Sequence, residues 1–157
     1  LRIFAELVRV APTLASYLIL VGPQLAETEK ALLAARGLTE QVRSLTQIDG
    51  ADLCALYSRA SLLLFPSLYE GFGWPIIEAQ ACGCLVVTSK RDPMKEISGG
   101  GAVLVDPHDA IEATIVISEA LGSRAASIRT IGYRNAKKFT ARAMIDKYEK
   151  VYTELIN

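Results

Sequence analysis

Short apolar segments alternate along the chain with longer segments of mixed polarity. Apolar runs of strand length predict β-strands at residues 17–21, 42–46, 61–65, 84–88 and 102–105. Helical patterns predict helices at residues 1–10, 24–36, 51–59, 75–81, 109–121, 124–139 and 141–156. The run at residues 17–21 is apolar enough to predict a buried strand. Breakers separate these elements, among them Gly22-Pro23, Gly37, Pro66 and Gly83.

Strands that alternate with helices imply parallel pairing through right-handed crossovers. We therefore expect an α/β fold, a doubly wound Rossmann-like parallel sheet of about five strands in a single domain. In such sheets, ligands bind outside the carboxyl ends of the strands. The loop that follows the strand at residues 61–65 is the first place to look for a site.

Composition and charge exclude several classes of protein. The length of 157 residues suits one domain with its own core, and no apolar run approaches the roughly 18 residues of a membrane span. Seventeen basic and 17 acidic side chains cancel, which argues against nucleic acid as a partner. Three cysteines and one histidine predict free, buried thiols of a cytoplasmic protein and no zinc site. Because the chain starts at Leu1 in a helical pattern, we expect it to be part of a longer protein.

The loop after residue 65 carries the candidate chemistry. It contains Glu70, Gly71 and Gly73, and Glu78 follows eight positions after Glu70 in the next predicted helix. Gly71 and Gly73 allow positive φ and close approach of a ligand to the backbone. The free N–H groups at the helix start form an anion site that suits a diphosphate. A carboxylate accepts two hydrogen bonds, so Glu78 can hold the two hydroxyls of a ribose and Glu70 those of a sugar ring.

Each of these features also has a purely structural interpretation. A pair of glycines before a helix often forms only a turn, and a glutamate in a first helical turn often only complements the helix dipole. Phe72 and Trp74 are equally compatible with a place in the core or at an interface. From the residues alone, a phosphate-binding loop and a simple turn are about equally supported.

The segment PSLYEGFGWPIIEAQACG resembles the signature of the group 1 glycosyl transferases, the retaining family 4 enzymes with the two-domain GT-B architecture. The hallmark of that family is a glutamate, seven intervening residues and a second glutamate, here Glu70 and Glu78. The resemblance extends to LVGP at 20–23, LCALYSRA at 53–60, GGGAVLVDP at 99–107 and the closing segment 124–152. It implies one half of a GT-B fold, the domain that binds the nucleoside-diphosphate sugar donor.

The resemblance also implies roles for individual residues. Glu70 resembles the glutamate that contacts donor-sugar hydroxyls near the reaction centre, and Glu78 the glutamate that binds the ribose. Gly71, Phe72, Gly73 and Trp74 occupy the stretch whose backbone N–H groups meet the sugar and the phosphates. Such enzymes transfer a hexose with retention to a glycan or lipid-linked acceptor. They generally need no metal cofactor, and no D-x-D triplet is present here.

The sequence departs from the family in three respects. Leu85 replaces a frequent proline, which we expect to alter packing and not chemistry. Thr46 replaces a frequent glycine, which puts the base-binding loop in doubt. The first strand of the domain, with its phosphate-binding Arg and Lys, and the whole acceptor domain have no counterpart in residues 1–157.

Three other features each have both a functional and a structural interpretation. The run at 106–109 is better explained as a turn with Asp109 as a helix cap than as a catalytic group. Glu96 is either a solvated side chain or part of the rim of the site. Basic residues in the late helices are either a solvated face or a peripheral contact with anionic lipid on the inner face of the membrane. A non-catalytic nucleotide-sugar-binding or protein-interaction module remains the alternative to the enzyme.

Overall fold

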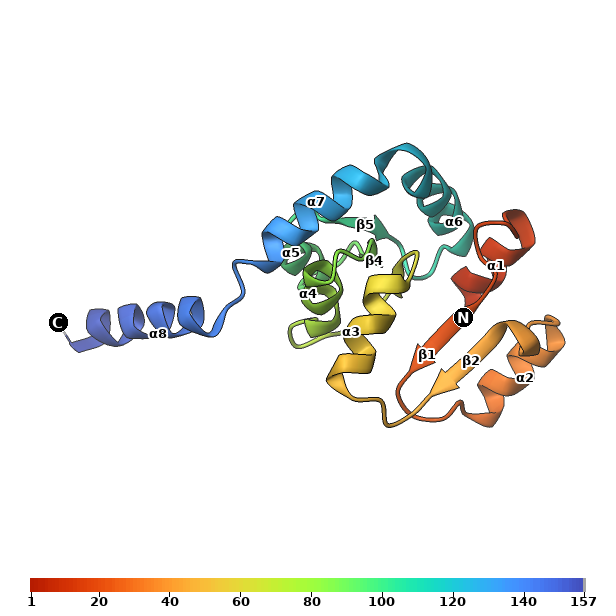
Figure 1. Ribbon diagram of the computed structural model, residues 1–157, viewed down its shortest axis with the longest axis horizontal. Coiled ribbons are helices and arrows are strands. Elements are labelled where there is room, and N and C mark those ends of the chain that lie inside the picture. The colour runs from red at the N-terminus through yellow and green to blue at the C-terminus, as the bar shows by residue number, and fades with distance from the viewer. Residues whose placement is uncertain (157) are drawn as a thin grey trace.

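The computed structural model describes residues 1–156, which form an α/β body and one projecting helix (Figure 1). The strands are β1 (Leu18–Val21), β2 (Val42–Leu45), β3 (Leu63–Phe65), β4 (Val86–Ser89) and β5 (Ala102–Val105). The α-helices are α1 (Arg2–Val10), α2 (Glu27–Ala35), α3 (Gly50–Arg59), α4 (Trp74–Ala81), α5 (Met94–Ser98), α6 (Ala110–Glu119), α7 (Ala125–Ala136) and α8 (Ala141–Ile156). A 3₁₀ turn, η1 (Thr39–Gln41), precedes β2, and a π-helical turn, η2 (Ala120–Arg124), joins α6 to α7.

All strand pairs are parallel, which confirms the predicted fold class. β1 pairs with β2, so that Leu18 lies opposite Val42. β4 lies between β3 and β5, with Val86 opposite Leu63 on one side and Ala102 on the other. The five strands thus form two ladders, of two and three strands, where one continuous sheet was predicted.

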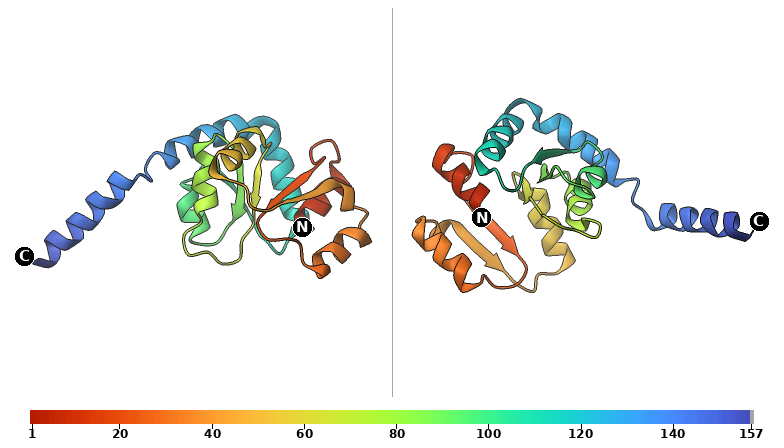
Figure 2. Two further views of the ribbon diagram at one scale, coloured as in Figure 1. Left: turned by 60° about the horizontal axis from the view of Figure 1, so that its bottom comes forward. Right: turned by 180° about the vertical axis from the view of Figure 1, so that it is seen from behind.

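Helices cover both faces of the three-stranded ladder, as expected of a doubly wound sheet. On one face, Val87 of β4 packs with Ile3 of α1 and Ile117 of α6. On the other face, Val86 packs with Ile76 of α4 and Met94 of α5. All four residues of β4 are buried, because this central strand has neighbours on every side. The views of Figure 2 show α4 and α6 on opposite sides of this ladder.

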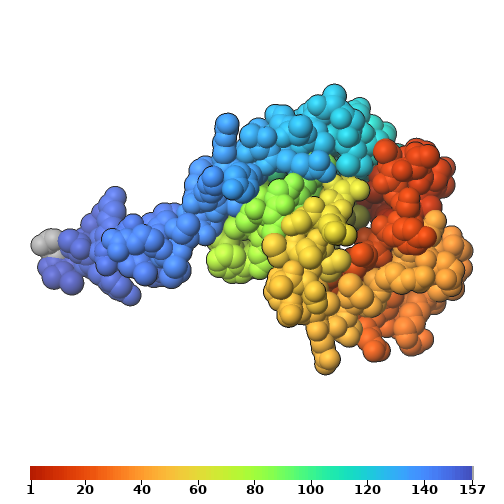
Figure 3. Space-filling model, viewed as in Figure 1, coloured from red at the N-terminus to blue at the C-terminus, as the bar shows by residue number. Residues whose placement is uncertain are grey.

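A cavity separates the two ladders. It has a volume of about 390 Å³ and lies between Leu18 and Leu20 of β1 and Leu64 of β3. Leu1 of the first helix and Pro66 after β3 also line it. Figure 3 shows the surface hollowed between the part that contains α1, β1 and β2 and the part that contains α3.

The prediction of a fully buried strand at residues 17–21 was wrong. Alternate side chains of β1 are exposed: Ile19 and Val21 each at 47% and Tyr17, just before the strand, at 71%. Leu18 and Leu20 face α1 and α2 and pack with Phe4 and Leu33. Within residues 1–156, one face of β1 packs on these helices and the other face is open, so the apolar run is only half covered.

Several predicted boundaries hold because a specific cap fixes them. Asp49 accepts a hydrogen bond from Asp52 N at the start of α3, and Asp109 accepts from the backbone N–H groups of the first turn of α6. Gly37 and Gly83 adopt positive φ directly after α2 and α4, where a left-handed residue ends a helix.

Other boundaries differ from the prediction. The short helix α5 was not predicted, because its five residues lie between turn-forming residues and are too few to show a helical pattern. β4 begins two residues later than expected, and α7 ends at Ala136 instead of residue 139. Helix α8 was predicted, and it extends away from the body with no buried residue (Figure 1). Its exposed apolar side chains recur at helical spacing: Met144, Ile145, Tyr148, Val151, Tyr152, Leu155 and Ile156.

Candidate functional site

The loop between β3 and α4 lies at the carboxyl edge of the three-stranded ladder. The end of β3 is fixed by Thr88 of β4, whose buried hydroxyl donates to Phe65 O at 2.9 Å. The loop then runs over the edge, where Ser67 Oγ donates to Tyr69 O at 3.0 Å. Glu70 is half-buried, and Tyr69 before it is 87% exposed. The strand–loop–helix arrangement expected around Glu70 is present.

Gly73 is the N-cap of α4 and has a left-handed backbone, with φ +97° and ψ 43°. A Cβ at this position would approach Ile76 Cδ1 to 3.3 Å, so glycine satisfies both the backbone and the space. Trp74 and Pro75 occupy the first two helical positions. Pro75 has no N–H and Ile76 N donates to Gly73 O at 3.0 Å, which leaves the Trp74 N–H as the donor that the first turn can offer to a ligand. Gly71 does not use the positive φ that a glycine allows, and a Cβ there would meet no atom within 4 Å.

The aromatic residues of the loop divide between core and surface. The Phe72 ring is half-buried and lies 4.8 Å from the Trp74 ring and 5.8 Å from the Phe139 ring, measured between centroids. It packs on the core cluster that contains Ile76. Trp74 is 58% exposed. Phe72 therefore anchors the loop, while Trp74 leaves an apolar surface beside the start of α4.

Glu78 is the fifth residue of α4, just beyond the first turn, and is exposed. The hydroxyl of Tyr57, on α3, donates to Glu78 Oε2 at 3.4 Å. Burial raises the pKa of the Tyr57 phenol, and the nearby Glu78 carboxylate raises it further, so Tyr57 remains a hydrogen-bond donor. Within residues 1–156, neither Glu70 nor Glu78 forms an ion pair. Sequence reasoning missed Tyr57, because nothing in its spacing from Glu78 signals a contact between two helices.

A network of buried side-chain amides holds α4 against the elements on which it packs. The Gln80 side chain is fully buried, and its Nε2 donates to Ser98 O at 2.9 Å and to Gly101 O at 3.0 Å. Asn135 Nδ2, on α7, donates to Gln80 Oε1 at 3.0 Å and to Ile97 O at 2.8 Å. These bonds join α4 to α7 and to the turn between α5 and β5. They were not predicted, because a glutamine between Ala79 and Ala81 does not indicate its partners, which lie far away in the sequence.

Close backbone contact accompanies this network. A Cβ on Gly101 would come within 2.3 Å of the Gly132 Cα, so the turn before β5 lies directly against α7. The amide groups and the two glycines together hold α4, and with it the loop, in one position relative to the sheet.

The remaining candidates have structural roles. Residues 106–109 form the expected turn, in which His108 N donates to Asp106 Oδ1 at 3.0 Å and Asp109 caps α6. Glu96 is exposed on α5. The three cysteines are free thiols as predicted, but the prediction that they are buried holds for Cys84 alone, because Cys54 is exposed and Cys82 is half-buried. No group of three His, Cys, Asp or Glu side chains within residues 1–156 could hold a metal ion. In the same residues, no helix has both the length and the apolar character to cross a membrane.

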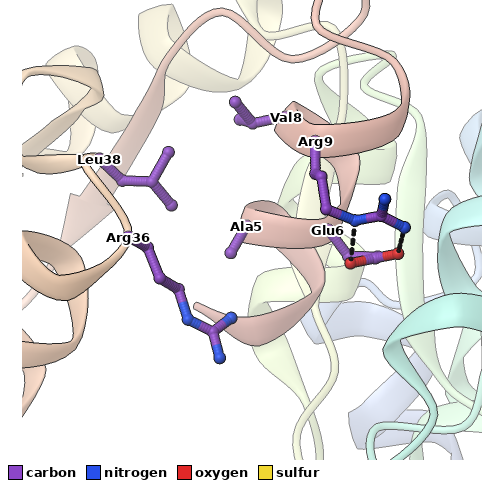
Figure 4. Close-up of a pocket in the computed structure, with 6 residues that line it drawn as sticks. All are labelled: Ala5, Glu6, Val8, Arg9, Arg36 and Leu38. Atoms are coloured by element: carbon purple, nitrogen blue, oxygen red, sulfur yellow. Dashed lines mark hydrogen bonds and ion pairs between the residues drawn. The ribbon is translucent and has the colours of Figure 1, made fainter.

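A second cavity of about 400 Å³ lies away from the loop, between α1 and the end of α2 (Figure 4). Ala5, Val8 and Leu38 give it apolar walls, and Arg36 reaches it from the opposite side. Figure 4 shows the Arg9 guanidinium bonded to the Glu6 carboxylate, so this charge is compensated. No residue of the loop after β3 lines this cavity.

The arrangement at the sheet edge has a defined chemical capacity. The start of α4 presents the Trp74 N–H and the positive end of a helix dipole, which favour an anion such as a phosphate. Glu70 and Glu78 supply hydrogen-bond acceptors on either side of that turn. The molecule is therefore a doubly wound α/β domain with a glycine-containing loop suited to an anion at the carboxyl edge of its sheet.

Comparison with known proteins identifies the family. Residues 5–139 match the model of the glycosyl transferases group 1, and the chain belongs to this family. It is 36% identical over 128 residues to the O-antigen chain mannosyltransferase B of Escherichia coli, a match that covers 80% of this chain and 32% of the relative. It is 37% identical over 137 residues to the D-inositol 3-phosphate glycosyltransferase of Salinispora tropica, covering 78% of this chain and 27% of the relative. The chain thus spans about a third or less of these relatives.

Solved structures share the fold over nearly the whole chain. The sucrose-phosphate synthase of Thermosynechococcus elongatus superposes with a TM-score of 0.80 at 27% identity, covering 98% of this chain and 42% of that one. Anabaena HepE, solved in complex with UDP and glucose, superposes with a TM-score of 0.81 at 22% identity, covering 97% and 44%. The C-terminal domain of a group 1 glycosyl transferase from Francisella tularensis superposes with a TM-score of 0.72 at 19% identity, covering 87% and 75%. The fold is that of one half of a GT-B glycosyltransferase, as the sequence predicted.

Proposed function

We propose that this chain is the donor-binding domain of a retaining glycosyltransferase, which moves a hexose from a nucleoside-diphosphate sugar to a glycan or lipid-linked acceptor. The observation that carries the proposal is the placement of Glu70, Gly73 and Glu78 around the start of α4, at the carboxyl edge of a parallel sheet. The family membership and the UDP and glucose bound to Anabaena HepE support the same ligand class.

Each residue of the loop has a role in this proposal. The Trp74 N–H and the positive end of the α4 dipole hold the diphosphate, and Glu78 accepts hydrogen bonds from the two ribose hydroxyls. Glu70 accepts hydrogen bonds from the sugar and stabilises positive charge that develops at its anomeric carbon. Gly71, Phe72 and Trp74 shape the surface against which the sugar lies. The reaction proposed uses no metal ion.

In our proposal, the acceptor binds to a part of the protein outside residues 1–157. The chain spans about a third or less of its relatives, and the cavity between β1 and β3 lies where a further strand could join the two ladders. The unpartnered apolar stripe of α8 supports a further domain in contact with that helix. We propose that the preceding part of the protein supplies the first strand, the basic residues that neutralise the leaving diphosphate, and the acceptor domain.

A ligand screen followed by a transfer assay tests the proposal. The full-length protein is first heated with UDP-, GDP- and ADP-hexoses, and the sugar that raises the unfolding temperature is then supplied with candidate acceptors. We expect transfer with retained anomeric configuration, detected by NMR, and loss of turnover in Glu70→Gln. Binding without transfer would support the non-catalytic module instead, and an inverted product would contradict the retaining mechanism.

The 157-residue chain alone provides a second test. We expect it to bind nucleotide weakly and to transfer no sugar, because much of the rate of a two-substrate reaction comes from holding both substrates together. Turnover by this chain equal to that of the full-length protein would place the acceptor site within residues 1–157 and refute the division proposed above.

A further inference from the structure

Two cysteines contact each other between α3 and α4. Cys54 is the fifth residue of α3, and Cys82 follows the last residue of α4 as its C-cap. Their Sγ atoms lie 3.3 Å apart. The third cysteine, Cys84, is buried, and its Sγ contacts backbone oxygens instead.

Dissolved reagents can reach the two cysteines, and their sulfurs can move close enough to form a disulfide. Cys54 is exposed and Cys82 is half-buried. A disulfide requires a sulfur–sulfur distance of about 2.05 Å, so the present contact must shorten by about 1.2 Å. No residue of α3 is buried, so a small shift of this helix disturbs little packing.

We propose that Cys54 and Cys82 form a reversible disulfide that ties α3 to the end of α4. The oxidant is a low-molecular-weight disulfide such as glutathione disulfide. The Cys54 thiolate attacks one sulfur of this molecule, which breaks its S–S bond and releases one thiolate. Cys82 then loses its proton and attacks Cys54 Sγ, which forms the protein disulfide and releases the second thiolate. Two electrons pass from the cysteines to the reagent, which leaves as two thiols.

The environment of each thiol supports this order of events. Burial, together with the contact to Cys54, raises the pKa of Cys82 to about 11, so Cys82 is protonated at neutral pH. Cys54, being exposed, is the sulfur that a dissolved reagent reaches first. Cys84 is buried and its Sγ contacts backbone oxygens, so a dissolved reagent does not reach this third thiol.

The disulfide would act on the candidate site through the same pair of helices. One turn from the cysteines, Tyr57 on α3 donates to Glu78 Oε2 on α4. A covalent link holds the Tyr57 hydroxyl against the carboxylate, where it competes with the ribose hydroxyls of the donor. This consequence rests on the function proposed above. We expect the oxidised protein to bind nucleotide roughly three- to tenfold more weakly than the reduced protein.

The first experiment tests the disulfide without reference to any nucleotide. The full-length protein is equilibrated with mixtures of reduced and oxidised glutathione, alkylated and digested, and its linked peptides are mapped by mass spectrometry. We expect a link between Cys54 and Cys82 in the native protein and in the matched control Cys84→Ser, and none in Cys54→Ser or Cys82→Ser. A stable glutathione adduct on Cys54 without the link, or a link that involves Cys84, would overturn the proposal.

The second experiment tests the coupling to the site. Affinities for UDP and GDP are measured by calorimetry for the reduced and the oxidised protein, in the native sequence and in Tyr57→Phe. We expect oxidation to weaken binding in the native sequence and to have no effect in Tyr57→Phe, which lacks the competing hydroxyl. Equal affinities of the oxidised and reduced native protein would refute the coupling. Failure of the reduced protein to bind UDP or GDP, and ADP in a further titration, would instead refute the proposed function and leave the mapped disulfide standing.

Discussion

Replacing Gln80 by methionine removes the three hydrogen bonds that join this side chain of α4 to its neighbours, and nearly preserves the volume of the side chain. The bonds are those to Ser98 O, to Gly101 O and from Asn135 Nδ2. Ser98 O keeps the hydrogen bond from Gly101 N, and Asn135 keeps its bond to Ile97 O. The Gly101 carbonyl loses its donor in a buried position.

The magnitude follows from these contacts. Each hydrogen bond contributes about 0.5–1.5 kcal/mol net, so three contribute about 3 kcal/mol. Methionine recovers about 1 kcal/mol through additional apolar burial. We expect the free energy of unfolding of Gln80→Met to be lower by about 2 kcal/mol.

Urea denaturation of the native protein and the variant measures this difference directly. The matched control is Gln24→Met, since Gln24 is exposed and lies outside any helix or strand. We expect the control to change stability by less than about 0.5 kcal/mol. A loss below about 1 kcal/mol in Gln80→Met would show that the amide network does not hold α4 in place, and would refute the reasoning.

Two further predictions concern the backbone and the acid stability. Gly73→Ala forces a left-handed backbone on alanine and brings its Cβ to 3.3 Å from Ile76 Cδ1. We therefore expect urea denaturation to show a free energy of unfolding that is lower by about 1–2 kcal/mol. The control Gly71→Ala, where a Cβ has open space, should show no measurable loss. The backbone N–H of His108, assisted by Lys90, holds the pKa of Asp106 below its usual value. Its stabilisation is therefore complete above the unfolded pKa of about 3.9 and is lost as the pH falls through the lower folded value. Stability measured against pH should fall less steeply below about pH 4 in Asp106→Asn, and identical acid profiles would contradict this assignment.

Local patterns in the sequence determine some features of this structure and not others. The strands, the caps at Asp49 and Asp109, and the strand–loop–helix around Glu70 depend on neighbouring residues, and they were predicted. The contact of Tyr57 with Glu78 and the network of Gln80 with Asn135 join residues 21 and 55 positions apart, and no local pattern encodes them.

Two departures from expectation have a common physical origin. Apolar character predicted a buried strand at 17–21, but burial depends on neighbours that the local sequence does not specify, and Ile19 is exposed. Both loop glycines allow positive φ, and the backbone uses it at Gly73 and not at Gly71. In each case the residue type permits a conformation, and the packing around it decides whether that conformation occurs.

Calorimetry of nucleotide binding to Glu78→Gln tests the central claim most directly. The full-length protein, this variant and the matched control Glu119→Gln, an exposed glutamate on α6, are titrated with UDP, GDP and ADP. Loss of charge-assisted hydrogen bonds to the ribose should cost about 1.5–3 kcal/mol, or roughly one to two decades in affinity, while the control binds as the native protein does. If Glu78→Gln binds every nucleotide as tightly as the native protein, Glu78 does not hold the ribose and the assignment of the donor site around α4 is contradicted.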